Sequence, residues 1–523
     1  MYRITEIALP LDGQEQELRA LAAKRLHVEP ERVCALSLVK KSVDARKKND
    51  VRFICTVECE VSGPKPRVKD PRVKACEPVV YQLPEFRPLQ SRPVIAGAGP
   101  AGLFAALILA QAGQRPILIE RGSDVDARTQ QVERFWRSGV LDSNTNVQFG
   151  EGGAGAFSDG KLNTGIKDPR MHKVLQEFVN AGAPREICWE ALPHVGTDRL
   201  CEVVKNLRAS IISLGGEVRF HTCLTDLRIS DGVLKAVQLN EGQWLDTNCL
   251  ILAVGHSARD TFRWLNRAGI PMEQKAFSLG ARIEHLQAEI DRAQYGGFAG
   301  HPALGAAPYK LAVHLENGRG VYTFCMCPGG QVVAAASEEG RVATNGMSYY
   351  ARDGINANAA LLVGIGPADF DSEHPLAGMF LQEKIEEQAF RVAGGGYRAP
   401  VQRVGDFMQR RISTGFGSVL PTYRPGVAFA SLDAILPQEV AGAMRQGLLK
   451  MNARLRGFAH PDALLTGPET RSSSPVRLLR GADCQSLGCR GLYPCGEGAG
   501  WAGGITSAAV DGIRCAEAVL RNA

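Results

Sequence analysis

The sequence predicts an α/β protein in which a Rossmann-like nucleotide-binding domain is interrupted by an α+β substrate domain and preceded by a small N-terminal β-α-β-β domain. Three observations support this fold class. A short apolar strand at 94–96 runs into closely spaced glycines and then into an apolar helix, which is the order of a nucleotide-binding βαβ unit. A second strand enters glycines and an acid at 491–504. Between them, residues 271–475 contain no further unit of this kind.

Composition sets broad limits on the protein. The chain has 523 residues, of which 45% are hydrophobic and 22% charged, enough for two or three domains with large cores. The net charge of +6 is small for this length and gives no whole-chain argument for nucleic acid or membrane binding. No apolar run approaches the length of a membrane span, and the start lacks a secretory apolar region. Fourteen cysteines without such a signal indicate reduced thiols and a cytoplasmic protein.

The N-terminal segment is expected to form a separate domain at 1–62. Residues 2–9, 32–39 and 51–61 are typical of strands, and 14–27 have helical spacing. A basic turn, Lys40–Lys48, joins the last two strands. We interpret it as a solvated hairpin tip, and the alternative is a contact with an anionic partner such as RNA or a phosphorylated ligand. No aromatic platform for base stacking accompanies it. The Pro-rich residues 63–92 are expected to be an extended linker.

The segment 93–121 is interpreted as a dinucleotide cradle. Gly97 allows the tight turn after the strand, Gly99 lets the backbone approach a pyrophosphate, and Gly102 lets the helix lie close to the strand. The helix that follows directs its free N–H groups at the phosphates. A second strand, 117–119, leads to an acid that accepts hydrogen bonds from a ribose. The candidate ligand-binding residues here are Gly97, Gly99, Pro100, Ala101, Gly102, Glu120 and Arg121.

A glycine-rich stretch at 149–161 follows the cradle. It contains a second literal GxGxxG, but a polar segment precedes it and Ser-Asp-Gly-Lys follows it, so it does not predict a second Rossmann unit. We interpret it as a backbone wall against a flat ligand, and the alternative is an irregular surface loop. The candidate residues are Gly152, Gly153, Ser158, Gly160 and Lys161. Lys161 could favour the anionic reduced form of a flavin by its charge.

The chain then returns to the parallel sheet. A helix from Thr197, a hairpin through Asp231-Gly232 and a buried strand at 249–254 continue a doubly wound sheet, so the first part of this domain spans 93–270. Gly255 brings bare backbone to the ligand at the end of that strand. His256 follows it and is a candidate catalytic residue, although a loop histidine without an identified partner is more often structural.

Residues 271–475 are expected to form the substrate or cap domain. Because no second strand-glycine-helix unit occurs there, NAD(P)H, if it is the donor, would have to dock in the substrate space. Val321–Cys327 and Val332–Ala336 are typical of two strands joined by a turn. Alternation along the first strand predicts that Cys325 and Cys327 point to opposite faces, which favours packing or ligand-lining thiols over a redox pair. A polar-aromatic loop with Tyr349 and Arg352 either orients a substrate or lies at the surface.

The return segment, 476–523, distinguishes FAD from NAD. A strand enters Gly496-Glu497-Gly498, and an apolar helix begins near Thr506. Glu497 could accept hydroxyls of a ribityl chain, and the helix N-terminus could stabilise negative charge at the flavin N1 to C2=O edge. The candidate cofactor residues of this segment and the preceding strand end are Gly255, Glu497, Gly504, Ile505 and Thr506.

Four motifs carry a family resemblance: Gly97-Ala-Gly-Pro-Ala-Gly102 with Glu120-Arg121, Phe149–Leu162, Thr323–Gly330, and Gly496–Ser507. Through them the chain resembles the flavoprotein superfamily with a glutathione-reductase-like FAD domain, and within it the bacterial group of uncharacterised FAD-dependent, or NAD(FAD)-utilising, dehydrogenases. The resemblance implies an FAD-binding domain interrupted by a substrate domain, a small N-terminal domain, and no particular substrate. The superfamily often has Asp where this chain has Glu497, which differs in reach by one methylene.

The sequence therefore predicts an FAD-dependent oxidoreductase that passes a hydride between a small molecule and non-covalently bound FAD. The alternative is a structural or sensing flavin, with an N-terminal domain that binds RNA or a protein partner. The catalytic candidates are Lys161, His256, Cys325, Tyr349 and Arg352, all in loops expected to face the flavin. No metal site is expected, because Cys484, Cys489 and Cys495 lack CxxC spacing. The oligomeric state is not predicted.

Overall fold

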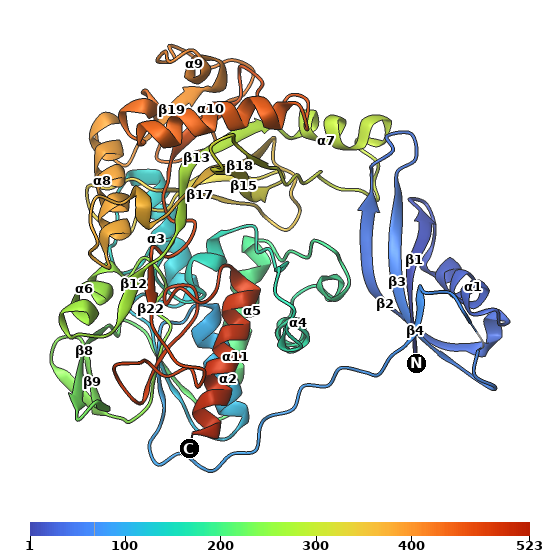
Figure 1. Cartoon of the computed structure of the whole chain (residues 1–523), viewed down its shortest axis with the longest axis horizontal. Coiled ribbons are helices and arrows are strands. Elements are labelled where there is room, and N and C mark those ends of the chain that lie inside the picture. Colours follow the sequence, from blue (N-terminus) through green and yellow to red (C-terminus); the bar gives the residue numbers. More distant parts are fainter. Residues whose placement is uncertain (67, 523) are drawn as a thin grey trace.

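Three parts make up the molecule in this computed structural model, which describes residues 1–66 and 68–522. The expected linker (63–92) and the expected return segment (476–523) thus each contain one residue outside the described part. A parallel-sheet domain lies at the bottom of Figure 1, an antiparallel-sheet domain lies above it, and the N-terminal domain stands to one side. Among the described residues, no helix is long and apolar enough to cross a membrane.

The N-terminal domain is a four-stranded antiparallel sheet with one helix, in the strand order β2-β3-β1-β4. Its elements are β1 (Tyr2–Pro10), α1 (Glu15–Leu26), the 3₁₀ helix η1 (Pro30–Arg32), β2 (Val33–Asp44), β3 (Arg52–Val61) and β4 (Val73–Ala75). Leu18 and Leu26 of α1 pack into the core of the sheet. β4 lies inside the segment expected to be a linker, because its backbone pairs with the free edge of β1 at Tyr2–Ile4.

The rest of the linker runs beneath the parallel-sheet domain (Figure 1). Several contacts hold it there. The Tyr81 hydroxyl lies 3.2 Å from a carboxylate oxygen of Glu517, the Leu89 amide donates to Gln114 Oε1 at 2.9 Å, and Arg92 Nη1 donates to Glu217 Oε2 at 2.8 Å. The extended path is therefore fastened to the domain along its length.

The central domain is built on a five-stranded parallel sheet in the order β23-β11-β5-β6-β7. Its strands are β5 (Val94–Ala96), β6 (Ile117–Ile119), β7 (Glu217–Arg219), β11 (Leu250–Leu252) and β23 (Leu492–Pro494), and its helices are α2 (Pro100–Gln111), α3 (Val125–Ser138), α4 (Arg170–Asn180), α5 (Thr197–Ser213), α6 (Arg259–Arg267) and α11 (Ile505–Arg521). Four of these strands are wholly buried, which is why they read as short continuous apolar runs.

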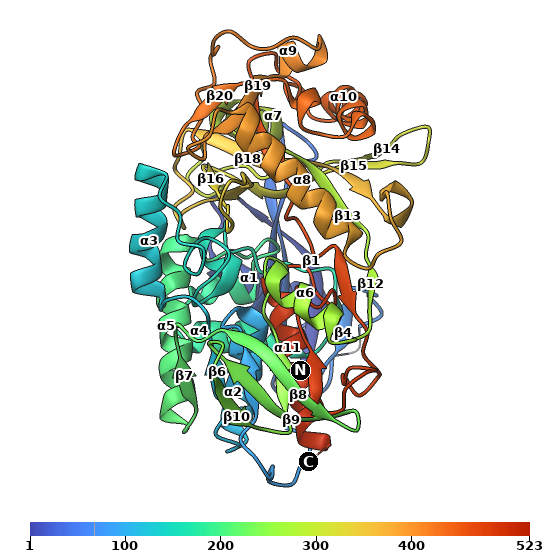
Figure 2. The ribbon, with the colours of Figure 1, turned by 90° about the vertical axis from the view of Figure 1, so that its left-hand side faces the viewer.

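Helices α2, α5 and α11 lie together against this sheet (Figures 1 and 2). Gly512 allows the close approach of α11 to α2, because a Cβ there would stand 2.1 Å from the Ala101 carbonyl oxygen. A separate antiparallel sheet of β8 (Leu224–Ser230), β9 (Val233–Leu239) and β10 (Gln243–Asp246) follows β7. Its first turn has positive φ at Asp231 and Gly232, as a tight hairpin requires.

The middle domain begins and ends at one place, where β12 (Met272–Gln274) pairs antiparallel with β22 (Val476–Leu478). It contains a seven-stranded sheet in the order β14-β15-β18-β13-β21-β19-β20 and a two-stranded sheet of β16 and β17. Its strands are β13 (Phe277–Leu286), β14 (Ala312–His314), β15 (Gly320–Cys327), β16 (Gln331–Ala334), β17 (Thr344–Met347), β18 (Asn356–Ile365), β19 (Ala399–Arg403), β20 (Val427–Phe429) and β21 (Leu464–Glu469). Its helices are α7 (Gln287–Tyr295), α8 (Ala377–Val392), α9 (Val404–Met408) and α10 (Gln438–Asn452). The remaining 3₁₀ helices are η2 (Gly153–Phe157), η3 (Arg185–Cys188), η4 (Gly296–Phe298), η5 (Pro367–Asp369) and η6 (Leu432–Ala434).

β15 and β16 are joined by a turn, as expected, but they do not pair with each other. β15 pairs with β14 and β18, whereas β16 pairs with β17. The turn redirects the chain because Gly330 packs tightly beneath β17, where a Cβ would stand 2.4 Å from the Met347 carbonyl oxygen.

The basic hairpin of the N-terminal domain contacts both other domains. The Lys41 amide donates to the Trp189 carbonyl at 2.6 Å, and the Ala191 amide donates to the Lys41 carbonyl at 2.8 Å. The ammonium of Lys48 donates to the carbonyl of Gln294 on α7. The tip is solvated as expected at Lys40, Lys47 and Lys48, which are exposed, but Lys41 and Lys48 also dock the hairpin on the rest of the chain.

Candidate functional site

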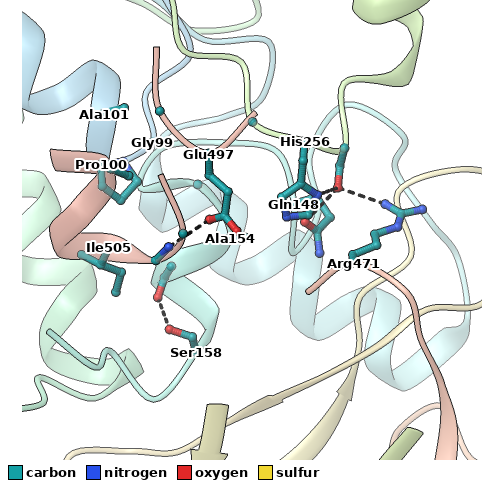
Figure 3. A pocket seen from close by; sticks show the side chains of 18 of the residues that line it. Gly99, Pro100, Ala101, Gln148, Ala154, Ser158, His256, Arg471, Glu497 and Ile505 are labelled. Atoms are coloured by element: carbon teal, nitrogen blue, oxygen red, sulfur yellow. Dashed lines mark hydrogen bonds between the residues drawn. The ribbon is translucent and has the colours of Figure 1, made fainter. Parts of the chain in front are cut away.

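A cavity of about 510 Å³ lies at the carboxyl ends of the parallel strands, between this sheet and the middle domain. The carboxyl edge of a doubly wound sheet is where such folds bind ligands, and the volume is typical of a ligand site. Figure 3 shows the part of the wall around Pro100, Glu497 and Ile505, and across from it His256, Gln148 and Arg471. Both domains contribute to the lining, so the cavity spans their interface.

The three glycines after β5 have different surroundings. A Cβ on Gly97, where φ is +102°, would stand 2.4 Å from the Ala253 carbonyl oxygen, and one on Gly102 would stand 1.8 Å from the Gly97 carbonyl oxygen. At these two positions, neighbouring atoms of the protein leave no room for a side chain. A Cβ on Gly99 would meet only Gly153 Cα, at 3.8 Å. Gly99 therefore leaves space on the cavity side that the protein does not fill.

Two helices begin at the cavity wall. α2 begins after Gly99 and α11 begins after Gly504, and both residues line the cavity. The first N–H groups of a helix have no partner within the helix and lie at its positive end. A Cβ on Gly503 or Gly504 would meet nothing within 4 Å. The two helix ends therefore offer unshielded donors to an anionic or polar ligand.

Glu120 lies at the carboxyl end of β6 and is 5% exposed. Its carboxylate accepts the amides of Ala98 at 2.8 Å, Gly122 at 3.0 Å and Gly150 at 3.0 Å. These bonds tie the turn after β5 to the glycine-rich loop. Glu120 therefore has an organising role that is additional to the ribose contact expected from the sequence.

The glycine-rich loop is held from behind by Arg128 of α3, which is fully buried. The guanidinium donates to the carbonyls of Asn146, Val147, Gly150, Glu151 and Gly153. Burial lowers the pKa of Arg128 to about 10, so the group stays protonated at neutral pH. Because the Arg128 guanidinium binds all five carbonyl groups, the loop has a defined shape despite its glycines.

Asp159 and Lys161 connect the end of this loop to the middle domain. Lys161 Nζ lies 2.9 Å from Asp159 Oδ2 and donates to the Met326 carbonyl. Arg352 Nε donates to Asp159 Oδ1 at 3.0 Å. Burial alone would raise the pKa of Asp159, but Lys161 and Arg352 outweigh it and lower the pKa to about 2. Asp159 is therefore an ionised, fully buried anchor for two cations that line the cavity.

The opposite wall carries the polar side chains of Gln148, His256 and Arg471 (Figure 3), and Ser257, which also lines the cavity, lies among them. Ser257 Oγ lies 3.0 Å from Gln148 Oε1, 3.4 Å from His256 Nδ1 and 3.3 Å from Arg471 Nη1. Burial, with added repulsion from Arg471, lowers the pKa of His256 to about 3. His256 is therefore a neutral imidazole across the physiological range and a poor proton donor. The charge of Arg471 is balanced by Glu386 at 2.8 Å.

Glu497 lies on the cavity wall next to the start of α11 (Figure 3). Its Oε2 accepts the Gly504 amide at 3.3 Å. Burial raises the pKa of Glu497 to about 7. The carboxyl is therefore poised between its neutral and ionised forms near neutral pH, and it faces the cavity with unused hydrogen-bonding capacity.

The expectation that Cys325 and Cys327 point to opposite faces is wrong. The pairing of β15 with β18 shifts register between Phe324 and Cys327, and Cys325 has φ of +43°. This bulge breaks the alternation of side chains. The Cys327 thiol lies 3.3 Å from the Cys325 carbonyl oxygen and also interacts with the Cys325 thiol. The two sulfur atoms therefore share one side of the strand.

Cys495, which lines the cavity, forms a buried cluster with Asp511 and Cys515, with ligand atoms within 4.8 Å of one another. Arg480 lies against it, donating to Asp511 at 2.6 Å and approaching the Cys515 sulfur at 3.3 Å. The guanidinium already supplies a positive charge to this cluster, which disfavours a metal ion at the same place.

Residues 276–472 match the family described as "FAD-dependent protein, C-terminal domain-like", and residues 1–60 match a "Domain of unknown function". A relative from Clostridium beijerinckii, described as "Uncharacterized protein", is 49% identical over 528 residues, covering 99% of this chain and 98% of its own. The chain belongs to this family of FAD-dependent proteins.

Solved structures resemble the chain only distantly. CtdE in complex with FAD covers 82% of this chain and 84% of its own at 12% identity and a TM-score of 0.30. A geranylgeranyl bacteriochlorophyll reductase-like protein from Thermoplasma acidophilum covers 82% and 77% at 13% identity and a TM-score of 0.35. The glycerol-3-phosphate dehydrogenase from Bacillus halodurans complexed with FAD covers 82% and 64% at 11% identity and a TM-score of 0.34. Similarity at this level carries no information on substrate or chemistry.

The cavity brings together most of the residues expected from the sequence. Those that line it are Gly97, Gly99, Pro100, Ala101, Glu120, Arg121, Gly153, Ser158, Lys161, Gly255, His256, Cys325, Arg352, Glu497, Gly504, Ile505 and Thr506. Three expected cofactor residues, Gly102, Gly152 and Gly160, stand behind the wall, where neighbouring backbone or side chains close around them. Tyr349 does not line the cavity and is 46% exposed, because Ser348 turns inward to Asp159.

Several residues at the site escaped prediction. They are Arg128, Arg282, Tyr309, Glu469 and Arg471. Arg128 alone had a usable signal, because it shares a helix face with the buried apolar residues Val132 and Phe135. The other four come from the middle domain, whose strands bring them together from distant parts of the chain.

The residues present fit the cofactor that the family name implies. The space beside Gly99 and the bare backbone at Gly255, Gly503 and Gly504 form a wall without side chains. Two helix N-termini face the same cavity, which suits a ligand with a pyrophosphate and a polar ring edge. FAD has both, so its two halves match the two helix ends.

Proposed function

We propose that this protein binds FAD non-covalently in the cavity and works as an oxidoreductase, transferring a hydride between FAD and a small-molecule substrate on the middle-domain side. The observation that carries the proposal is a single cavity with two helix N-termini at one end and reactive side chains of the middle domain at the other. The family membership supports FAD as the ligand.

Each half of the cofactor has residues to hold it. The N-terminus of α2, beside Gly99, would hold the pyrophosphate. Glu120 already accepts three amides, and a carboxylate has about four acceptor positions, so one remains for a ribose hydroxyl. Glu497 would accept ribityl hydroxyls, and the N-terminus of α11 would stabilise negative charge on the ring by ~0.3–1 kcal/mol.

Bound FAD would supply a two-electron acceptor and donor. The protein supplies the charged and hydrogen-bonding side chains around the cofactor. Lys161, held by Asp159, keeps a fixed positive charge at the cavity wall. Neutral His256 can donate or accept one hydrogen bond without gaining a proton. The Tyr309 hydroxyl is buried, lines the cavity and has no partner among the described residues, so it can donate to a substrate.

The test is a flavin spectrum of the purified protein and its bleaching under anaerobic conditions by candidate donors, NADH and NADPH among them. We expect bound FAD that is released on denaturation and reduced by at least one donor class. A colourless protein that takes up no added FAD would contradict the proposal. FAD that binds but is reduced by no donor would favour a structural or sensing flavin instead.

The alternative in which the N-terminal domain binds RNA has less support. Lys41 and Lys48 contact the rest of the chain, and Arg46 pairs with Asp44 at 2.7 Å. Lys40 and Lys47 remain exposed. Two exposed lysines without aromatic neighbours are a weak basis for nucleic-acid binding.

A further inference from the structure

The bulge of β15 carries two thiols at the middle-domain wall of the cavity. Cys325 lines the cavity, whereas Cys327 is 0% exposed and lies behind it. Because the bulge breaks the alternation of β15, both side chains lie on one side, and the Cys327 thiol donates to the Cys325 carbonyl oxygen at 3.3 Å. One thiol thus faces the ligand space and a second lies within reach of it.

Two cations fasten this bulge. Arg282 donates to the Cys325 carbonyl at 2.8 Å, and Lys161 donates to the Met326 carbonyl. Arg282 is fully buried and Lys161 lines the cavity. They come from different domains, Arg282 from β13 and Lys161 from the glycine-rich loop. The positive charges converge on the backbone that carries the two thiols.

This arrangement favours one thiolate and one thiol. The hydrogen bond from Cys327, together with the charges of Lys161 and Arg282, holds the pKa of Cys325 well below the ordinary range of a thiol, although burial opposes it. The same interaction raises the pKa of Cys327. A thiolate next to a protonated thiol is the reactive form in thiol–disulfide chemistry.

The thiols also lie near the expected position of the flavin ring. Cys325 lines the same cavity as Glu497, whose carboxylate accepts the Gly504 amide at the start of α11. Lys161 spans from the glycine-rich loop to the Cys325–Cys327 bulge. The pair therefore occupies the wall where the ring half of the cofactor would meet the middle domain.

We propose that Cys325 and Cys327 are a redox-active dithiol that forms a reversible disulfide by exchanging two electrons with FAD. In the oxidising direction one S–S bond forms between the Cys325 thiolate and the Cys327 thiol, which together give up two electrons and one proton. The two electrons and that proton pass to FAD, which becomes its anionic two-electron-reduced form. This inference rests on the proposed function and adds a second two-electron centre to the same site.

Anaerobic titration with dithionite tests the proposal by electron counting. The oxidised protein should take up about four electrons per FAD, because flavin and disulfide are each two-electron couples. Cys325→Ser should take up about two. Cys34→Ser is the matched control, since Cys34 is exposed on β2 far from the cavity, and it should behave as the unsubstituted protein. An uptake of two electrons by the unsubstituted protein would overturn the inference.

A second measurement does not depend on activity or on folding of a variant. Trypsin cleavage after Arg319 and Arg341 releases a peptide, residues 320–341, whose cysteines are Cys325 and Cys327 alone. After alkylation under denaturing conditions, this peptide from the oxidised protein should carry no label and should have lost two hydrogen atoms. Full labelling of both thiols in protein whose FAD is oxidised would overturn the proposal. Absence of FAD would instead contradict the proposed function, so the two failures are distinguishable.

Discussion

Replacing Gly99 by valine separates cofactor binding from folding. A Cβ at this position would meet only Gly153 Cα at 3.8 Å, and Gly99 has an ordinary φ of −76°. The free energy of unfolding should therefore change by less than about 1 kcal/mol. The valine methyl groups would occupy the space in front of the N-terminus of α2. We expect FAD affinity to fall at least ~100-fold, which corresponds to ~2.8 kcal/mol.

The assay is titration of the apoprotein with FAD, followed by flavin fluorescence, alongside thermal unfolding of each variant. Gly242→Val is the matched control, because Gly242 is exposed and a Cβ there meets nothing within 4 Å. Gly102→Val should lose the fold itself, since a Cβ there would stand 1.8 Å from the Gly97 carbonyl oxygen. FAD affinity of Gly99→Val equal to that of the unsubstituted protein would show that the pyrophosphate does not pass this residue.

Three further outcomes follow from the structure. Arg128→Met should lower the free energy of unfolding by at least ~3 kcal/mol, measured by denaturant titration, because it leaves buried carbonyls without a donor; a loss below ~1 kcal/mol would refute this role. Burial raises the pKa of Glu151 to about 7, so its proton binds more tightly in the folded state. The free energy of unfolding should fall by up to ~3 kcal/mol as pH rises from about 4.5 to 7, because the folded state loses the tightly bound proton of Glu151. The Glu151→Gln variant should lack this part of the pH dependence. Identical plots of unfolding free energy against pH for the two proteins would contradict the prediction. Neutralising Lys40, Arg46 and Lys47 together should leave any RNA retention and its salt dependence unchanged; a salt-sensitive loss would revive the nucleic-acid alternative.

Local patterns explain what could be predicted from the sequence. The turn after β5 is predictable because its glycines follow a buried strand within a few residues. A Cβ on Gly102 would meet the Gly97 carbonyl oxygen of the same unit, whereas the space at Gly97 is closed by Ala253, which follows β11. The parallel strands are visible because burial on both faces makes them continuous apolar runs. The helix after Gly504 is also predictable from its own segment, because a strand, glycines and an apolar run follow one another there. These features depend on neighbours in the chain.

The errors arose where distant residues decide the local conformation. Alternation along β15 predicted opposite faces for Cys325 and Cys327, but Arg282 of β13 and Lys161 of the glycine-rich loop hold the backbone at a bulge. Tyr349 was expected in the site, but the neighbouring Ser348 turns to Asp159 in another domain. No spacing rule within these segments could have revealed partners that lie more than forty residues away.

The docked N-terminal hairpin makes the cavity a meeting point of three domains. Lys41 is hydrogen-bonded to the segment just before Leu192, and Lys48 is bonded to Gln294. Leu192 and Gln294 both line the cavity, the first from the central domain and the second from the middle domain. The hairpin thus connects two segments that line the cavity from different domains, and residues outside the cavity couple the position of one segment to that of the other.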